Sequence, residues 1–220
     1  MLLIYRYFIN LLFPFIIILI YFRKFFNKEH KTRYKEKLFI SSFNVKKNKR
    51  KKLIWFHAAS IGELKSIIPL IKEIDKKKKF NFLITTVTVS SSYLVKKELK
   101  NKNVIHRFFP IDKQSVVNKF LDQWSPNIIL FVDSEIWPNF LLTIKKRNIP
   151  LILLNGRITQ KTFSRWNKIP ITAKKVFQSF NLCLPSSKTS KKYLKKLKAK
   201  NIKYYGNLKL TSEKTSTDLN

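Results

Sequence analysis

Several residue types are scarce in this chain of 220 residues, and each scarcity excludes a class of protein. Cys183 is the only cysteine, so no intrachain disulfide can form, which fits a reducing cytoplasmic setting. It lies in the apolar run 182–184, where we expect a small buried side chain rather than a reactive thiol. With one cysteine and three scattered histidines, the chain has too few ligands for a structural zinc site, and we expect no metal.

Acidic residues and arginine are also few. The chain has 12 Asp and Glu against 46 Lys and Arg, which gives a net charge of +34. Such a charge would suit nucleic acid, but only 8 of the 46 are Arg, the residue that makes bidentate phosphate and base contacts. The lysine excess occurs together with abundant Asn, Ile and Phe and only 3 Gly, which is typical of AT-rich codons rather than of one basic face. We therefore expect no nucleic-acid partner, although the charge favours anionic surfaces such as phospholipid and phosphorylated lipid.

The amino-terminal segment, residues 1–22, is almost entirely apolar apart from two polar side chains, one of them Arg6. Its length is close to the roughly 20 residues that cross a bilayer as a helix. No small-residue cleavage site follows, so we predict an uncleaved membrane anchor rather than a removed signal peptide. The Lys/Arg-rich stretch 23–52 predicts that the remaining chain lies on the cytoplasmic side. Pro14 would kink a spanning helix, which leaves shallow interfacial insertion open.

The rest of the chain alternates between apolar runs of strand length and helical patterns. We expect a basic linker over 23–52, one Rossmann-like domain over 53–210 and a polar tail over 211–220. The predicted strands are 53–58, 81–87, 104–109, 127–133, 150–155, 181–185 and 202–205. The predicted helices are 63–75, 90–100, 113–124, 138–147 and 188–198. Apolar strands with helical crossovers indicate an α/β fold with a parallel sheet. Ser90 is predicted to cap the second of these helices, and Pro138 to occupy the first turn of the fourth.

Two carboxylates follow predicted strands and are candidates for chemistry. Glu63 ends the run His57-Ala-Ala-Ser-Ile-Gly-Glu63, and Glu135 lies in Asp133-Ser-Glu-Ile-Trp-Pro-Asn139. Ligands of open α/β sheets bind at the carboxyl ends of the strands, so scarce acids placed there indicate an active site. We expect Gly62 to supply a permissive turn and the helix start to keep Glu63 ionised, able to accept a proton. The structural alternatives are that Glu63 only caps its helix and that Glu135 pairs with a lysine.

Neighbouring polar and aromatic side chains suit structural roles better than binding roles. We expect His57 to be hydrogen-bonded beneath the Glu63 loop, and Trp137 to pack rather than to stack on a sugar. The threonines of 85–88 are ordinary strand residues, although their hydroxyls could bind a sugar. Arg157, at the end of a predicted strand, could clamp a phosphate or carboxylate, with a structural ion pair as the alternative.

Six short motifs occur in one order along the chain. They are His57-Ala-Ala-Ser-Ile-Gly-Glu63, Thr85-Thr-Val-Thr88, Phe109-Pro-Ile-Asp112, Asp133-Ser-Glu-Ile-Trp-Pro-Asn139, Leu154-Asn-Gly-Arg157 and Gly206-Asn-Leu-Lys209. Together they resemble the amino-terminal half of the bacterial 3-deoxy-D-manno-octulosonic acid (Kdo) transferases of lipopolysaccharide synthesis, over essentially the whole chain. Two departures are mild: the family often has Val-Ser-Val-Gly-Glu at 59–63 and Asn-Ala-Arg at 155–157.

The resemblance implies a two-domain GT-B glycosyltransferase at the cytoplasmic face of the inner membrane. In this family the amino-terminal domain takes the lipid A precursor (lipid IVA), and the carboxyl-terminal domain holds most of the donor CMP-Kdo. It implies that Glu63 is the general base that deprotonates the attacking sugar hydroxyl, and that Glu135 is a second acid that positions substrate groups. The reaction inverts configuration and requires no metal or cofactor. The matching motifs add five candidate substrate-binding residues: Ser60, Gly62, Arg157, Asn207 and Lys209.

The length of the chain departs most from the family pattern. The sequence stops just after the motif 206–209, where the family crosses into its second domain. We therefore expect the donor-binding half to be missing from this polypeptide, which alone would not transfer Kdo, and a separate carboxyl-terminal domain to restore transfer. Three alternatives remain open: a non-catalytic, membrane-anchored lipid-binding remnant, a different sugar transferase of the same architecture, and a basic nucleic-acid-binding protein.

Overall fold

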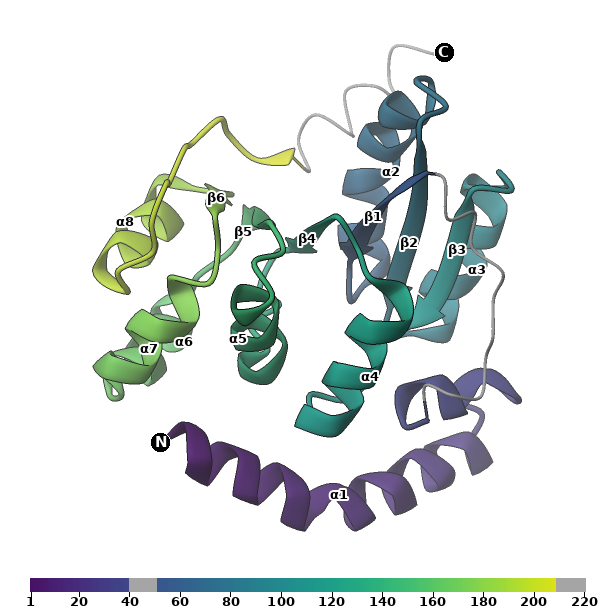
Figure 1. The fold of residues 1–220 in the computed structure, drawn as a ribbon, viewed down its shortest axis with the longest axis horizontal. Helices are drawn as coiled ribbons and strands as arrows, with labels where there is room; N and C mark the ends of the chain where they lie inside the picture. The colour runs from purple at the N-terminus through teal and green to yellow at the C-terminus, as the bar shows by residue number, and fades with distance from the viewer. Residues whose placement is uncertain (40–50, 209–220) are drawn as a thin grey trace.

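A computed structural model of the chain describes residues 1–39 and 51–208. Within these residues a six-stranded parallel sheet has the order β3-β2-β1-β4-β5-β6 and lies between two layers of helices (Figure 1). The strands are β1 (Lys52–His57), β2 (Phe80–Thr86), β3 (Val104–Phe108), β4 (Ile128–Val132), β5 (Leu151–Gly156) and β6 (Leu182–Pro185). This is the doubly wound order, in which the direction of winding reverses between β1 and β4. The predicted α/β, Rossmann-like fold is confirmed.

The helices follow the prediction except between β5 and β6. The predicted helices are α2 (Ile61–Asp75), α3 (Val89–Glu98), α4 (Gln114–Trp124), α5 (Pro138–Lys146) and α8 (Lys188–Lys196). Two further helices were not predicted: α6 (Gln160–Asn167) and α7 (Pro170–Phe177). α6 is short, and its apolar face consists of Phe163 and Trp166, which pack partly buried against the larger core, so its periodic signal extends over a single helical spacing. The predicted strand at 202–205 is wrong: Ile202 forms a single bridge with Cys183, and the chain then leaves the sheet.

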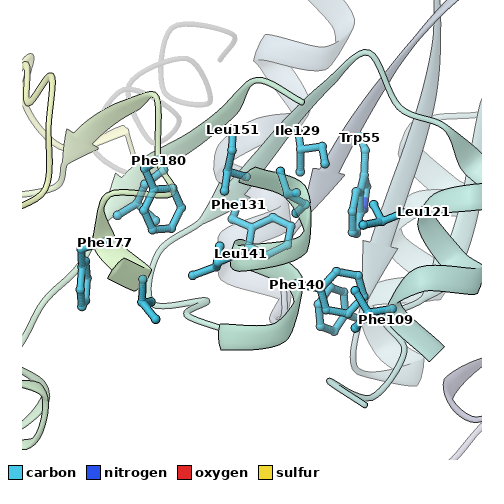
Figure 2. Close-up of a cluster of buried hydrophobic side chains, with 14 of the residues drawn as sticks. Trp55, Phe109, Leu121, Ile129, Phe131, Phe140, Leu141, Leu151, Phe177 and Phe180 are labelled. Atoms are coloured by element: carbon cyan, nitrogen blue, oxygen red, sulfur yellow. The ribbon is translucent and has the colours of Figure 1, made fainter. Parts of the chain in front are cut away.

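Each face of the sheet buries its own hydrophobic core. Alternate strand residues such as Trp55 and Phe131 pack with α4, α5, α7 and α8, and Figure 2 shows the aromatic centre of this larger cluster. The intervening residues, such as Phe56 and Val132, pack with α2 and α3 on the other face. Burial of each such large side chain stabilises the fold by about 1.5–3 kcal/mol. Because β1 and β4 contribute to both cores, the positions of their carboxyl ends are fixed. Cys183 is a free, buried thiol in the larger cluster, as expected.

One of the two predicted helix starts differs from the prediction, and the other agrees with it. Thr88, not Ser90, caps α3: its hydroxyl accepts a hydrogen bond from the amide of Ser91 at 3.2 Å. The predicted Ser90 cap is wrong because the helix begins at Val89, which places Ser90 inside its first turn. Pro138 is the first residue of α5, as predicted.

The amino-terminal segment forms the long helix α1 (Leu2–Phe25), which continues through Pro14. It is the one helix in the described part of the chain long and apolar enough to cross a membrane, by length and composition only. A short 3-10 helix, η1 (Arg33–Lys37), follows inside the predicted linker. There the buried Glu36 accepts a hydrogen bond from the amide of Phe108 at 2.8 Å, so this part of the segment packs on edge strand β3. Residues 40–50 of the predicted linker, Lys209 and the predicted tail lie outside the described residues.

Candidate active site

The two central strands bring the candidate carboxylates to one edge of the sheet. β1 ends at His57, and α2 begins four residues later with Glu63 in its first turn. β4 ends at Val132, and the loop to α5 carries Glu135. Because α2 and α5 pack on opposite faces of the sheet, the two loops separate at this point. Such a reversal of winding leaves the crevice in which doubly wound proteins bind ligands.

The carboxylate of Glu63 is tied to the start of its own helix. Its Oε2 accepts a hydrogen bond from the amide of Ala59 at 2.8 Å, and its Oε1 accepts one from the hydroxyl of Ser60 at 2.9 Å. In return, the amide of Glu63 donates to the hydroxyl of Ser60 at 3.3 Å. This arrangement is a variant of the capping box. Glu63 therefore does cap its helix, as the structural alternative for this residue stated. The expected permissive turn at Gly62 is wrong: Gly62 is helical, and the glycine with a positive φ is Gly206.

The pKa of Glu63 lies above its ordinary value. Burial is the main cause, and the negative charges of Glu135 and Asp133 add to it, while the hydrogen bonds from Ser60 and Ala59 oppose it. The helix start was expected to favour the ionised form of this carboxylate; desolvation acts in the opposite direction and has the larger effect on its pKa. A raised pKa makes a carboxylate a stronger base. These charge effects also indicate that Glu63, Glu135 and Asp133 lie near one another.

Glu135 is held by an aromatic and an imidazole side chain rather than by a lysine. Its Oε2 lies 3.0 Å from Nε2 of His57 and accepts a hydrogen bond from Nε1 of Trp137 at 2.6 Å. Burial acts to raise the pKa of Glu135, but the bonds from His57 and Trp137, with the charge of His57, outweigh it and hold that pKa below its ordinary value. The pKa values of Glu63 and Glu135 are thus shifted in opposite directions. This pattern is typical of carboxylate pairs in which one group transfers a proton and the other stabilises charge.

His57 connects Glu135 to the interior of the sheet. The ring is fully buried and stacks on Phe109, with ring centroids 3.7 Å apart. Its Nδ1 lies 3.1 Å from the hydroxyl of Thr85, which accepts a hydrogen bond from Nε1 of Trp55 at 2.8 Å. The predicted hydrogen-bonded role of His57 is confirmed, but its carboxylate partner is Glu135 and not Glu63. No local sequence pattern indicates this pairing, because it depends on β1 and β4 being neighbours in the sheet.

A second group of candidates surrounds a cavity of about 340 Å³ at the ends of β5 and β6. Arg157 is exposed directly after β5 and lines this cavity together with Asp133, Asn155 and Asn207. In residues 1–39 and 51–208, no acidic side chain lies within ion-pair distance of Arg157, so the structural ion pair is not observed. The amide of Leu208 donates to Oδ1 of Asn155 at 3.1 Å, which holds the segment of Asn207 beside β5.

The structure therefore brings the predicted site residues together in two groups. Ser60, Gly62 and Glu63 form one group at the start of α2, where the charge of Glu135 acts on Glu63, and Arg157 and Asn207 form the other. Asp133 belongs to both, since it lines the cavity and its charge raises the pKa of Glu63. Sequence reasoning noted Asp133 beside Glu135 but did not assign it to the site. Among the residues described, no cluster of three or more His, Cys, Asp or Glu side chains could hold a metal ion.

Solved structures of UDP-N-acetylglucosamine 2-epimerases share this fold. The chain matches UDP-GlcNAc 2-epimerase from Neisseria meningitidis with a TM-score of 0.55 and 14% identity, over 76% of this chain and 50% of that one. It matches the UDP-N-acetylglucosamine 2-epimerase from Rickettsia bellii with a TM-score of 0.53 and 16% identity, over 76% and 48% of the two chains. At such low identity the likeness shows the fold alone: the domain is a GT-B-like half.

Sequence comparison identifies the family. A mitochondrial protein of Arabidopsis thaliana named as a probable 3-deoxy-D-manno-octulosonic acid transferase is 37% identical over 61% of this chain and 31% of its own length. The 3-deoxy-D-manno-octulosonic acid transferase of Rickettsia felis is 34% identical over 74% of this chain and 35% of its own length. That of Rickettsia bellii is 30% identical over 94% of this chain and 49% of its own length. The chain thus spans half or less of the curated relatives that it matches. Residues 32–212 match the family described as 3-deoxy-D-manno-octulosonic-acid transferase. The chain belongs to the Kdo transferase family.

Proposed function

We propose that this chain is the acceptor-binding half of an enzyme that transfers Kdo from CMP-Kdo to the lipid A precursor, lipid IVA. The transfer takes place at the cytoplasmic face of the inner membrane. One observation carries the proposal: Glu63 and Glu135 follow the two strands at which the winding reverses, and each has a displaced pKa. Family membership supports the reaction type, and the apolar helix α1 supports the membrane location.

In the proposed reaction Glu63 acts as general base. It removes the proton from the primary hydroxyl of the distal glucosamine as that oxygen bonds to the anomeric carbon of Kdo. The bond from that carbon to the phosphate oxygen of CMP breaks at the same time, CMP departs with the electron pair, and the configuration inverts. The raised pKa of Glu63 supports this role, because a base is effective when its pKa is close to the working pH. General base catalysis of this kind contributes about 10²–10⁴-fold to a rate.

The proposed role of Glu135 is to position substrate groups. Its Oε2 is occupied by His57 and Trp137, whereas its Oε1 has no hydrogen-bond partner in the part of the chain that the structure describes. A lowered pKa keeps the group ionised, so Oε1 can accept hydrogen bonds from sugar hydroxyls. Trp137 packs against Phe109, which fixes the orientation of the carboxylate.

The remaining proposed contacts come from the two groups of candidates. Ser60 and Gly62 would meet the acceptor beside Glu63, and nothing lies within 4 Å of the place where a Cβ of Gly62 would be. Arg157, Asn207 and Lys209 would bind a phosphate or carboxylate of the substrates, for which a guanidinium is well suited.

The proposal assigns the donor side to a companion half, in the same protein or in a separate polypeptide. GT-B chemistry requires both walls of the cleft, so we expect the 220-residue polypeptide, tested alone, to bind lipid IVA without transferring Kdo. Kdo transfer by this polypeptide alone would contradict that expectation. Transfer restored by a carboxyl-terminal domain of a relative would support it.

The decisive experiment compares two glutamates of α2 in the restored enzyme. Glu63→Gln should lower the transfer rate at least 100-fold with lipid IVA binding retained, because the amide cannot accept the proton. Glu73→Gln is the matched control: Glu73 lies on the same helix, its side chain is 69% exposed, and it forms a surface ion pair with Lys76. A fully active Glu63→Gln variant would exclude the base assignment. Lipid binding without any restorable transfer would favour the non-catalytic remnant.

A further inference from the structure

The amino end of α1 is tied to the folded domain by two side-chain hydrogen bonds. The hydroxyl of Tyr5 donates to Oδ2 of Asp112 at 2.7 Å, and Nε of Arg6 donates to Oδ1 of Asn139 at 3.0 Å. Asp112 follows β3 and Asn139 is the second residue of α5, so both acceptors lie at the carboxyl edge of the sheet. This is the edge that carries Glu63 and Glu135.

The same helix contacts the domain again further along. The ammonium group of Lys113 lies 3.7 Å from the ring centroid of Phe13. Ile20 is buried in a cluster with Tyr34 and Leu38 of the η1 segment, against which Ile111, from the loop after β3, also packs. The first and last of these contacts are 15 residues apart, which is about 22 Å along a helix axis. Figure 1 shows α1, in purple, running across the lower edge of the molecule below α4 and α5. The helix is therefore attached to one folded domain near both of its ends.

The outward face of α1 is almost wholly apolar. Ile20 is its only buried residue. The exposed large hydrophobic side chains between residues 1 and 26 are Met1, Leu3, Ile4, Tyr7, Phe8, Leu11, Leu12, Phe15, Ile18, Leu19, Tyr21, Phe22, Phe25 and Phe26. An exposed apolar surface of this kind marks an interaction site. Residues 1–39 also carry eight Lys and Arg against two Glu, a net charge of +6, which is complementary to anionic lipid headgroups.

We propose that α1 lies in the plane of a lipid monolayer, with its outward face among the acyl chains, and does not span the bilayer. A spanning helix has one end on each side of the membrane, whereas both ends of α1 contact the same domain. Spanning would require the Tyr5–Asp112 and Arg6–Asn139 bonds to break, leaving polar groups of a buried carboxylate and amide without these partners. In the interface the contacts persist and the apolar face is removed from water.

This placement has a consequence for the candidate site, although it does not depend on the proposed function. Asp112 and Asn139 connect α1 to the loops after β3 and β4, so the membrane surface adjoins the crevice between β1 and β4. A substrate carried by lipid could then reach the crevice while its acyl chains remain in the monolayer.

Depth measurements with spin labels test the proposal on the full chain. Cysteines would replace Leu3, Leu11, Ile18 and Phe25, which are all exposed and lie within roughly 80° of one another at 100° per residue. The native Cys183 should stay unlabelled, because it is buried and burial raises the pKa of its thiol to about 12. The vesicles would contain phosphatidylethanolamine with a minority of phosphatidylglycerol. We expect all four labels at one depth, within about one helical turn of 5 Å. Labels of Leu3 and Phe25 about 33 Å apart along the membrane normal would overturn the proposal.

A matched pair of tyrosine variants tests the attachment itself. Tyr5→Phe removes the bond to Asp112, whereas Tyr7→Phe removes a hydroxyl from the exposed, outward side of the same helix. We expect only Tyr5→Phe to increase the mobility of a label at Leu3. Equal spectra for the two variants would contradict the role of Asp112 in holding α1. Vesicles of phosphatidylcholine alone should bind the chain more weakly, and equal binding would exclude the contribution of anionic headgroups.

Discussion

Asp112 joins the amino-terminal helix to the carboxyl edge of the sheet, and its protonation should control part of the stability. Its carboxylate accepts hydrogen bonds from the amides of Asn139 at 3.0 Å and Phe140 at 2.9 Å, and from the hydroxyl of Tyr5 at 2.7 Å. It thus caps α5, because the side chain of the N-cap residue Trp137 accepts no hydrogen bond from the first turn of that helix. Burial nevertheless raises the pKa of Asp112 from 3.8 to about 6, because the loss of hydration outweighs the three bonds.

The sign and size of the pH dependence follow from this pKa. The folded protein retains the proton of Asp112 at pH values where the unfolded chain has released it, so stability from this group is fully present below pH 3.8 and is lost as the pH rises through about 6. A rise of about 2.2 units corresponds to about 3 kcal/mol at 1.36 kcal/mol per unit. Asp112→Asn cannot ionise. The unfolding free energy of the native protein minus that of this variant should therefore fall by about 2–3 kcal/mol between pH 4 and pH 7.5.

Urea denaturation in detergent, followed by tryptophan fluorescence at several pH values, measures this difference. All other titrating groups are common to both proteins and cancel to a first approximation. A difference that stays constant within about 0.5 kcal/mol, or that grows with pH, would refute the reasoning. Tyr5→Phe provides a second check: it removes a bond that lowers the pKa of Asp112, so the loss of stability should move to higher pH.

Two further predictions concern the candidate site. Gly156→Ala should destabilise the protein by about 1–3 kcal/mol, since a Cβ there would lie 2.6 Å from the buried Leu153 Cδ2. Gly62→Ala, with nothing within 4 Å, should instead stabilise α2 by about 0.5–1 kcal/mol. Equal changes in the unfolding temperature of the Gly156→Ala and Gly62→Ala variants would contradict the two predictions. Trp137→Phe removes the 2.6 Å bond to Glu135 and should raise the pKa of that carboxyl, which a carboxyl NMR titration would detect; an unchanged value would contradict the assigned cause.

Local patterns were sufficient for most of the elements. α2 carries apolar side chains at helical spacing, such as Leu64, Ile67 and Ile71, and these residues are buried as that spacing requires. α6 was not predicted in this way, because its apolar face is limited to the partly buried pair Phe163 and Trp166. The cap of α3 was predicted at Ser90, whereas the backbone begins the helix at Val89 and so places Thr88 at the cap.

The sequence by itself determined that Glu63 stands at a helix start and Glu135 after a strand, because strand, loop and helix follow one another within a few residues. The ordered motifs also determined the family. Only the tertiary structure decided that His57 meets Glu135, 78 residues away, and that Asp112 caps a helix beginning 26 residues later and binds Tyr5, 107 residues before it. These contacts, and the opposite pKa displacements of the two glutamates, depend on which strands are neighbours and on how deeply each carboxylate is buried. Both are properties of the packed sheet, which no local pattern contains.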